Sequence, residues 1–382
     1  MPGIASSSAA PIRQRQLLKP YTTFKIGGPA AYWVEVGSAD SLLEALAFRK
    51  VEDLDLFILG GGSNILVSDR GFDGLVVHPV NRGICVSGED ADTVALRIGA
   101  AESWDDTVAY AVADGLWGIE NLSHIPGQTG AALVQNIGAY GAQLSDVFVS
   151  AEVMAIETGE IQVLDREACR LGYRTSIFNT TSRGRLVTLS LTLRLKKRGE
   201  PNLGYPDLRA YFQEWSSKPI GSARPPGLAE IRQAIVTIRD RKFPFPREEK
   251  GGNAGSFFKN LLLTETEYLQ LEEQFQRHFG PGELDRLREL RNRFPAAGQI
   301  RIPTAFLIEI CGLKGCRIGG AQVNETQPLV LLNQGGATAH DVLTLAHHVR
   351  QTIYAKTGMA IEIEPELVGF TPAELADYLS LS

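Results

Sequence analysis

The amino-acid sequence predicts an α+β protein built from two or three domains. Its 382 residues exceed what a single hydrophobic core usually supports. The N-terminal part has a strand–helix–strand order, the middle part is rich in strand-like segments, and the last part contains charged and amphipathic helices. The composition, with 44% hydrophobic and 21% charged residues, is that of an ordinary globular protein.

The first unit has an α/β order. Residues 32–36 predict a strand, residues 38–50 predict a helix capped by Ser38, and residues 54–59 predict a second strand. The second strand ends in the glycine-rich sequence GGGSN, and residues 75–79 predict a further short strand.

The middle segment mixes helix and sheet. Residues 103–115 predict a helix, and residues 126–141 form a second glycine-rich loop. Residues 149–164 predict a β-hairpin that turns at its Thr-Gly pair, and residues 186–197 predict a β-branched, apolar strand.

The last part begins after a proline- and glycine-rich stretch at 219–227. A helix is predicted next, with one apolar face made of Leu228, Ile231, Ile235 and Ile238. Further helices are predicted at 264–279, from Asp341 to Lys356 with Gly358 as its stop, and at 371–379 with a capping box. Residues 361–370 predict a strand or an extended tail.

Charge and hydropathy narrow the class of protein. The formal net charge of −6 gives no electrostatic reason to expect nucleic acid or an anionic membrane as a partner. No run approaches the ~20 apolar residues that cross a bilayer. Residues 1–16 lack the apolar core of a signal peptide. These features predict a cytoplasmic enzyme with a loose N-terminal extension.

The cysteine and histidine patterns predict no metal site. Cys85, Cys169, Cys311 and Cys316 form no CxxC pair and no Cys/His cluster at zinc spacing. We expect them to be reduced and mostly buried thiols. The six histidines form no metal pair either.

The two glycine-rich loops predict a nucleotide site. GGGSN follows a strand, so it is either a tight turn or a cradle of backbone amides for phosphate. It is not a Walker loop, and Ile65 stands where a Rossmann motif needs its third glycine. The loop at 126–141 offers a second surface of approachable amides. Together the loops predict a dinucleotide whose pyrophosphate is clamped without a Rossmann fold.

Six stretches of the chain together resemble the UDP-N-acetylenolpyruvoylglucosamine reductases, flavoenzymes that make UDP-N-acetylmuramate for bacterial peptidoglycan. They are PYTTFKIGGPA from Pro20, LGGGSNILVSD from Leu59, IPGQTGAALVQNIGAYG from Ile125, YRTSIF from Tyr173, GGNAGSFFKN from Gly251 and EPE from Glu364. Each motif alone is weak. The resemblance is specific because all six occur in the family's order, over roughly residues 17–370.

The resemblance implies an FAD-binding unit of the vanillyl-alcohol-oxidase/PCMH type with two subdomains, and a C-terminal α+β domain that closes over the substrate. The implied parts are a flexible extension at 1–16, FAD-binding subdomains at 17–82 and 83–224, a substrate domain at 225–360, and a tail at 361–382 with a catalytic glutamate.

The resemblance also implies non-covalent FAD, NADPH as hydride donor and UDP-N-acetylglucosamine enolpyruvate as substrate. The implied enzyme is a monomer that serves cell-wall synthesis, and through it cell shape and division. By motif position, the residues expected to line the flavin are Tyr21, Thr22, Lys25, Gly27, Gly60, Gly61, Gly62, Ser63, Asn64, Pro126, Gly127, Gly130, Asn136, Gly138 and Ala139.

The implied reaction explains three further residues. Hydride addition to an enolpyruvyl ether leaves negative charge that spreads into the carboxylate, so a cation or a held proton must stabilise it. Arg174 is the candidate cation, although a surface salt bridge would be its ordinary role. Glu366 is the candidate hydrogen-bond donor if its carboxyl stays protonated in a dry site. Glu366 is preferred to Glu364, two residues before it, because Glu366 holds the family's position.

Ser256 is the candidate acid that delivers a proton to the carbon. The carbanion-like intermediate is a strong base, so even a serine hydroxyl held at the right place can protonate it. We expect Gly251, Gly252 and Gly255 to let the backbone approach flavin and substrate. The alternative is a glycine-rich turn whose serine caps a helix.

Supporting roles follow by motif position. Tyr205 resembles the tyrosine on a loop that closes over the substrate, and Tyr173 is a further substrate contact. Lys242 and Asn260 resemble groups that hold the UDP-sugar or nicotinamide phosphates, although a loop lysine is often only solvated. Two residues depart from the family pattern. They are Val368, where a basic residue is frequent, and Phe294, where a tyrosine is expected.

Two other functions fit parts of the pattern. A flavin oxidase of the same cofactor fold would need no serine acid and would be reoxidised rapidly by air. A non-catalytic nucleotide-sugar binding protein would bind a UDP-sugar and hold no flavin.

Overall fold

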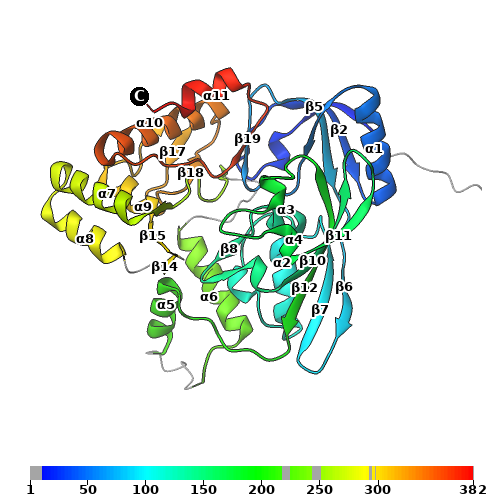
Figure 1. The fold of residues 1–382 in the computed structure, drawn as a ribbon, viewed down its shortest axis with the longest axis horizontal. Coiled ribbons are helices and arrows are strands. Elements are labelled where there is room, and N and C mark those ends of the chain that lie inside the picture. The colour runs from blue at the N-terminus through cyan, green and yellow to red at the C-terminus, as the bar shows by residue number, and fades with distance from the viewer. Residues whose placement is uncertain (1–10, 217–223, 243–250, 292–294, 297, 382) are drawn as a thin grey trace, which may run out of the picture. The chain divides into compact units, whose positions relative to one another are not determined.

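The computed structural model describes residues 11–216, 224–242, 251–291, 295–296 and 298–381 (Figure 1). The chain forms two compact units, each made of three separate segments. Unit 1 comprises residues 1–16, 30–61 and 73–241, and unit 2 comprises residues 17–29, 62–72 and 242–382. The domain boundaries that the resemblance implies stay predictions.

The first sheet of unit 1 has the strand order β1-β2-β5-β3. Its strands are β1 (Arg13–Leu17), β2 (Pro29–Val36), β3 (Asp55–Ile58) and β5 (Phe72–Pro79), and β3 runs parallel to β5. Helix α1 (Ala39–Val51) buries Leu42, Ala45 and Leu46 in one core with the sheet. Ser38 caps the helix as predicted, because its side chain accepts a hydrogen bond from the Ser41 amide.

The second sheet of unit 1 is antiparallel and has the order β11-β10-β12-β7-β6. Its strands are β6 (Ile84–Glu89), β7 (Thr93–Gly99), β10 (Phe148–Ala155), β11 (Ile161–Asp165) and β12 (Leu186–Lys196). The predicted hairpin at 149–164 is confirmed, and Gly159 adopts a φ of 72° at its turn. Helices α2 (Trp104–Ala113), α3 (Thr129–Val134) and α4 (Arg166–Cys169) contribute to the core of this sheet.

The second glycine-rich loop contains more regular structure than the sequence predicts. Its middle forms helix α3, because Ala132 and Leu133 are apolar and bury themselves in the core of the second sheet. Its end forms a small hairpin of β8 (Gly138–Ala139) and β9 (Ala142–Gln143). Interpreting the whole stretch as a loop was therefore wrong for these residues.

Helices α5 (Pro206–Ser216) and α6 (Leu228–Lys242) complete unit 1. The predicted apolar face of α6 is confirmed, since Leu228, Ile231, Ile235 and Ile238 are all buried. Most of the proline- and glycine-rich stretch at 219–227 lies outside the described residues.

Unit 2 surrounds a second large core that contains Phe24, Phe257 and Phe258. Its strands are β4 (Ile65–Val67), β13 (Leu261–Leu263), β14 (Pro295–Ala296), β15 (Gln299–Ile302), β16 (Arg317–Ile318), β17 (Ala321–Val323), β18 (Leu331–Asn333) and β19 (Glu366–Val368). Its helices are α7 (Glu265–His278), α8 (Pro281–Arg291), α9 (Thr304–Ile310), α10 (Ala339–Thr357) and α11 (Pro372–Leu379).

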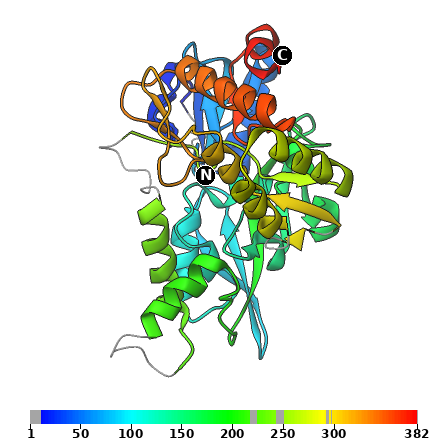
Figure 2. The same cartoon turned by 90° about the vertical axis from the view of Figure 1, so that its left-hand side faces the viewer.

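The C-terminal elements of unit 2 match their predictions. Helix α10 ends at Gly358, whose φ of 70° is the left-handed conformation that a C-terminal glycine supplies. Helix α11 has the predicted capping box of Thr371 and Glu374 and lies beside α10 (Figures 1 and 2). In the described ranges, no helix combines the length and apolar character that a bilayer crossing requires.

Candidate active site

The two glycine-rich loops meet inside unit 1. A Cβ atom on Gly61 would lie 2.6 Å from the Gly127 Cα and 2.9 Å from the Gln128 amide nitrogen. A Cβ on Gly60 would lie 3.0 Å from the Ala131 Cβ. Only glycine allows backbones to approach this closely, so the loops form one continuous backbone surface. This is the fit that a pyrophosphate needs, because amides can face it without side chains between them.

The part of the first loop that belongs to unit 2 is equally tight. Gly62 has a φ of +59°, and a Cβ there would lie 2.1 Å from the Tyr21 carbonyl oxygen. The Thr23 amide donates to the Gly62 carbonyl over 3.0 Å. A Cβ on Gly27 would lie 3.0 Å from the Val67 Cβ. The predicted flavin-lining residues near 21–27 therefore pack directly on the end of the first loop.

Three predicted flavin-lining residues use their polar groups within the protein. Asn136 donates to the Ser145 hydroxyl and the Gly172 carbonyl, and its Oδ1 accepts from the Ser145 amide. The Thr22 hydroxyl donates to the Ile26 carbonyl over 3.0 Å. The Gly130 amide donates to the Ala100 carbonyl over 2.8 Å. These hydrogen bonds hold the shape of the loops, and the flavin-lining role of the three residues stays a prediction.

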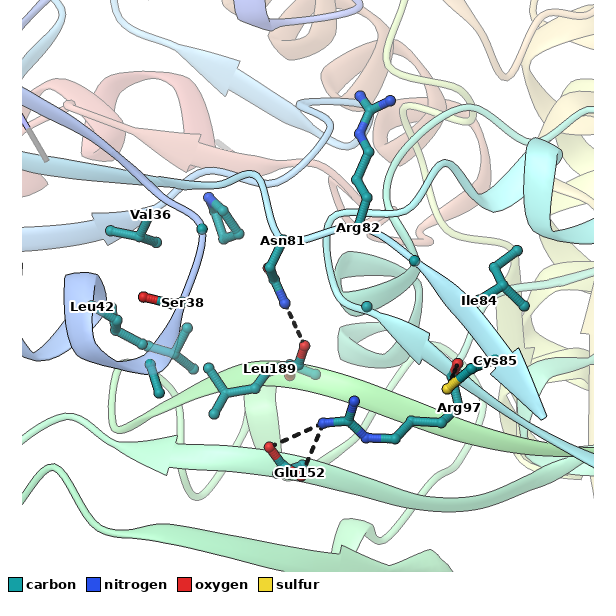
Figure 3. A pocket seen from close by; sticks show the side chains of 17 residues that line it. Val36, Ser38, Leu42, Asn81, Arg82, Ile84, Cys85, Arg97, Glu152 and Leu189 are labelled. Atoms are coloured by element: carbon teal, nitrogen blue, oxygen red, sulfur yellow. Dashed lines mark hydrogen bonds and ion pairs between the residues drawn. The ribbon is translucent and has the colours of Figure 1, made fainter. Parts of the chain in front are cut away.

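Unit 1 contains a cavity of about 340 Å³ (Figure 3). The ends of β2 and β5, the start of α1 and strands β6, β7, β10 and β12 line it. Asn81 spans one side, where its Nδ2 donates to the Leu189 carbonyl over 2.6 Å (Figure 3). Gln128 connects this cavity with the first glycine-rich loop. Its Nε2 donates to the carbonyl of Pro79, which lines the cavity. Its Oε1 lies 3.4 Å from the position that a Cβ atom on Gly60 would occupy.

The sequence analysis missed this cavity. Its lining residues Pro79 and Thr188 come from segments far apart in the chain, and neither belongs to a glycine motif. One signal was available. The carboxyl ends of parallel strands in open α/β sheets are where ligands bind, and Pro79 ends such a strand.

Arg174 is held by the hairpin that ends the second loop. Its guanidinium donates to the Gly138 carbonyl over 3.2 Å and lies 5.8 Å from the centre of the Tyr173 ring. Its φ is 53°, a left-handed conformation that a non-glycine residue adopts only at some cost. Tyr173 is 38% exposed. The structure thus joins three predicted site residues, Arg174, Tyr173 and Gly138, within unit 1.

Tyr205 packs on the tip of the same hairpin. Its ring meets the Tyr140 ring edge-on, with the centres 5.2 Å apart. Burial raises the pKa of Tyr140 to about 12, so the hydroxyl stays protonated, and it is hydrogen-bonded to Arg239. Burial lowers the pKa of Arg239. The sequence analysis did not identify Tyr140 or Arg239 as site residues.

Ser256 lies in an extended segment of unit 2 with neighbours on both sides. The Phe257 amide donates to the Leu329 carbonyl over 2.7 Å, and the Phe257 carbonyl accepts from the Glu364 amide over 2.9 Å. Both Phe257 and Phe258 are fully buried, as expected. Among the described residues, the Ser256 hydroxyl has no hydrogen-bond partner. Ser256 does not cap a helix, because the next helix, α7, is capped by Thr264.

Two of the glycines before Ser256 allow a close approach of backbone segments within the protein. A Cβ on Gly251 would lie 1.6 Å from the Asn333 carbonyl oxygen, and a Cβ on Gly252 would lie 2.0 Å from the Thr23 carbonyl oxygen. Their close neighbours are thus backbone atoms of the protein itself. Gly255, with a φ of +71° and no atom near its Cβ position, is the one that faces open space.

Glu366 lies beside the end of the first loop. Strand β19, which begins at Glu366, pairs in parallel with β4, and the Glu366 amide donates to the Asn64 carbonyl over 3.0 Å. The Asn64 side chain donates to the Glu364 carbonyl over 3.4 Å. Unit 2 therefore brings together the Ser256 segment, the Glu366 strand and Asn64. Arg174 belongs to unit 1.

The remaining predicted residues have structural contacts. The Lys242 carbonyl accepts from the Thr326 hydroxyl over 2.6 Å, and Asn260 Oδ1 accepts from the Thr304 amide at the start of α9. Val368 is 4% exposed and pairs with Val67. Phe294 lies outside the described residues.

The cysteines are free thiols. Cys169 and Cys311 are buried as expected, whereas Cys316 is half-buried and Cys85 is exposed beside the cavity. Within the described ranges, no group of three or more His, Cys, Asp or Glu side chains could hold a metal ion.

Comparison with known proteins identifies the family. Residues 246–368 match the model of the UDP-N-acetylenolpyruvoylglucosamine reductase C-terminal domain, and residues 30–165 match that of an FAD binding domain. The chain is 38% identical to the UDP-N-acetylenolpyruvoylglucosamine reductase of Neisseria gonorrhoeae over 356 residues, which cover 93% of this chain and 97% of that protein. This chain belongs to the UDP-N-acetylenolpyruvoylglucosamine reductase family.

Two further members of this reductase family agree with the assignment. The reductase of Burkholderia pseudomallei is 35% identical over 365 residues, which cover 96% of this chain and 99% of that one. The crystal structure of the reductase from Thermus caldophilus superposes with a TM-score of 0.62 at 24% identity, covering 94% of this chain and 98% of that one. The predicted fold class is confirmed. As a family member, this chain is an FAD-dependent oxidoreductase of peptidoglycan synthesis.

Proposed function

We propose that this reductase uses NADPH to reduce the enolpyruvyl ether of UDP-N-acetylglucosamine enolpyruvate to UDP-N-acetylmuramate, as a cytoplasmic monomer. One observation carries the proposal. In unit 2 the Ser256 segment, the strand of Glu366 and the end of the GGGSN loop are joined by direct hydrogen bonds. A hydroxyl that can act as an acid, a carboxyl group and a cofactor loop in the same part of unit 2 are the groups that reduction of this double bond requires, which supports the proposal.

FAD is held by backbone and by cavity walls. The surface where Gly60, Gly61 and Gly127 meet would hold the pyrophosphate, and the walls of the cavity at Asn81 and Thr188 would hold the adenosine. The cavity volume of 340 Å³ is at the lower end of the ~300–1,000 Å³ typical of ligand sites, which suits part of the cofactor and not all of it. When bound, FAD would supply the hydride.

The side chains supply charge stabilisation and the proton. Arg174 grips the substrate carboxylate, where a planar guanidinium can make two parallel hydrogen bonds. Glu366, when it carries a proton, donates a hydrogen bond to the charge that develops on the carboxylate. Ser256 transfers its hydroxyl proton to the carbon next to the carboxylate. Tyr173, Tyr205, Lys242 and Asn260 bind the rest of the substrate or the nicotinamide nucleotide.

One spectroscopic experiment tests the proposal. The purified protein should be yellow, and anaerobic NADPH should bleach the flavin band. Adding the enolpyruvyl substrate should then restore the colour and form UDP-N-acetylmuramate. Reoxidation that needs only air would favour a flavin oxidase, and a colourless protein that cannot be reconstituted with FAD would favour a nucleotide-sugar binding protein. Either result would overturn the proposal.

A further inference from the structure

The loop that carries Tyr205 is attached to the β8–β9 hairpin through one buried side-chain amide. Asn121 lies in the short 3-10 helix Glu120–Leu122 of unit 1, and its side chain is 1% exposed. Its Nδ2 donates to the Tyr140 carbonyl over 2.8 Å and to the Asn202 carbonyl over 2.9 Å. These two carbonyls belong to the hairpin tip and to the loop that leads into Tyr205.

The orientation of the Asn121 amide is fixed by chemistry. Both neighbours are carbonyl oxygens, so only the NH2 group can face them. The other atom, Oδ1, is buried and has no donor within the described part of the chain. Burying an acceptor without a donor costs free energy. We therefore infer that the two hydrogen bonds donated by Nδ2 are what keep this side chain in its buried position.

The hairpin tip that Asn121 holds is tightly constrained. Tyr140 and Gly141 have φ values of 48° and 81°, and they form the two-residue turn between β8 and β9. Positive φ at both central residues is the type I′ turn, whose geometry leaves little freedom. The Tyr140 hydroxyl is hydrogen-bonded to the half-buried Arg239, and its ring packs against Tyr205.

The other end of the hairpin reaches the predicted catalytic cation. Gly138, in β8, accepts the hydrogen bond from Arg174. The hairpin is therefore a rigid connection, with Arg174 at its base and Tyr205 at its tip. Asn121 sets the spacing between that tip and the Tyr205 loop.

We propose that Asn121 is a positioning residue for substrate binding, which holds the Tyr205 loop in register with the hairpin that supports Arg174. The inference rests on the proposed function, because it takes Tyr205 to be a substrate contact. Asn121 acts through its backbone partners and not by touching the substrate.

A second side-chain amide, at the surface, also connects the Tyr205 loop with the hairpin tip, and it provides a matched comparison. Asn202 is exposed, and its Nδ2 donates to the Gly141 carbonyl over 3.1 Å. Water can replace an exposed hydrogen bond but not one of the buried bonds from Asn121. Removing the Asn202 side chain should therefore have the same kind of effect as removing that of Asn121, only smaller.

The test compares Asn121→Ala, Asn202→Ala, Tyr205→Ala and the double variant Asn121→Ala/Tyr205→Ala in steady-state assays of the FAD-loaded enzyme. We expect Asn121→Ala to raise the KM for the enolpyruvyl substrate about five- to twentyfold with kcat within about threefold, and Asn202→Ala to raise it about two- to fivefold. The double variant should have a KM close to that of Tyr205→Ala alone, because the two residues act through one contact.

The outcomes separate this inference from the proposed function. If Tyr205→Ala leaves the KM unchanged, Tyr205 is not a substrate contact, and both that assignment and this inference fail. If Tyr205→Ala raises the KM but Asn121→Ala does not, or if the two effects multiply, only the inference fails. Should Asn121→Ala not hold FAD, Asn202→Ala decides, and an unchanged KM there overturns the inference.

Discussion

Hydrogen bonds fix the backbone beside Ser256, while its hydroxyl has no partner among the described residues and no structural contact that its removal would break. Ser256→Ala should therefore leave the fold, the bound FAD and flavin reduction by NADPH nearly unchanged. Flavin reoxidation by the enolpyruvyl substrate should slow by roughly two to four orders of magnitude, the usual loss for a positioned acid. Stopped-flow absorbance measures the two half-reactions separately.

The control for Ser256→Ala is Ser87→Ala, which removes an exposed hydroxyl from β6. This variant should change neither half-reaction. Equal slowing of both steps in Ser256→Ala would mean that Ser256 maintains structure, and no slowing would mean that another group provides the proton.

Gly61 gives a second prediction at this scale. In Gly61→Ala the new Cβ would lie 2.6 Å from the Gly127 Cα, so the two loops must separate. We expect the Kd for FAD to be at least tenfold higher than in the parent, as measured by flavin fluorescence on dilution. Gly282→Ala is the matched control, because Gly282 is helical and no atom lies within 4 Å of its Cβ position. That variant should keep FAD affinity and gain up to about 1 kcal/mol of stability from helix propensity.

At the scale of elements, short sequence patterns correctly predicted the features that depend on neighbouring residues in the chain. The Ser38 cap, the turn at Gly159, the buried face of α6 and the stop at Gly358 follow from short-range rules, and the structure confirms them. Helix α3 was missed because its glycine-rich flanks obscured a short apolar run. The pairing of β4 with β19 joins residues about 300 positions apart, and no local pattern encodes such a contact.

The candidate site also has residues that the sequence could indicate and residues that only the fold could reveal. The motif resemblance predicted Arg174, Ser256 and Glu366, and the hydrogen bond between Phe257 and Glu364, which are the neighbours of Ser256 and Glu366 in the chain, fits that interpretation. Asn121, Tyr140 and the cavity were not predicted. Their roles depend on which backbone atoms lie beside them, and that information is absent from residue types alone.

The cavity between the strands of unit 1 gives a prediction for the cofactor. Thr188→Trp, in β12, should fill much of the space at Asn81 and weaken FAD binding by about tenfold or more. FMN, which lacks the adenosine, should bind parent and variant equally, as titrations of the apoprotein can measure. Val163→Trp is the control, because Val163 is 68% exposed on the same sheet, and it should leave both affinities unchanged. Equal weakening of FAD and FMN would remove the adenosine from this cavity.

At the scale of the whole molecule, His78 couples stability to pH. Burial lowers the pKa of His78 below its usual 6.5, while its Nδ1 lies 2.7 Å from the Leu59 carbonyl and its ring stacks on Trp33. Between the lowered pKa and 6.5, the unfolded chain binds more protons than the folded one. The contribution of His78 is therefore complete above pH 6.5 and is lost as the pH falls through this window.

The measurement is the urea midpoint of parent and His78→Gln at pH 7.5 and at pH 5.5. The parent should lose more stability on acidification than the variant, by no more than about 1.4 kcal/mol per pH unit for one proton. An identical pH response of the two proteins would contradict this assignment.

The division of the chain between the two units has a consequence for synthesis on the ribosome. Residues 17–29 and 62–72 emerge early, yet they belong to the same unit as residues 242–382, which emerge last. At ~5–20 residues per second, Phe24 and Leu66 must wait on the order of 10–50 s for partners such as Phe257 that bury them. Throughout that delay, apolar segments of the nascent chain are available to chaperones, and translation speed becomes a determinant of yield.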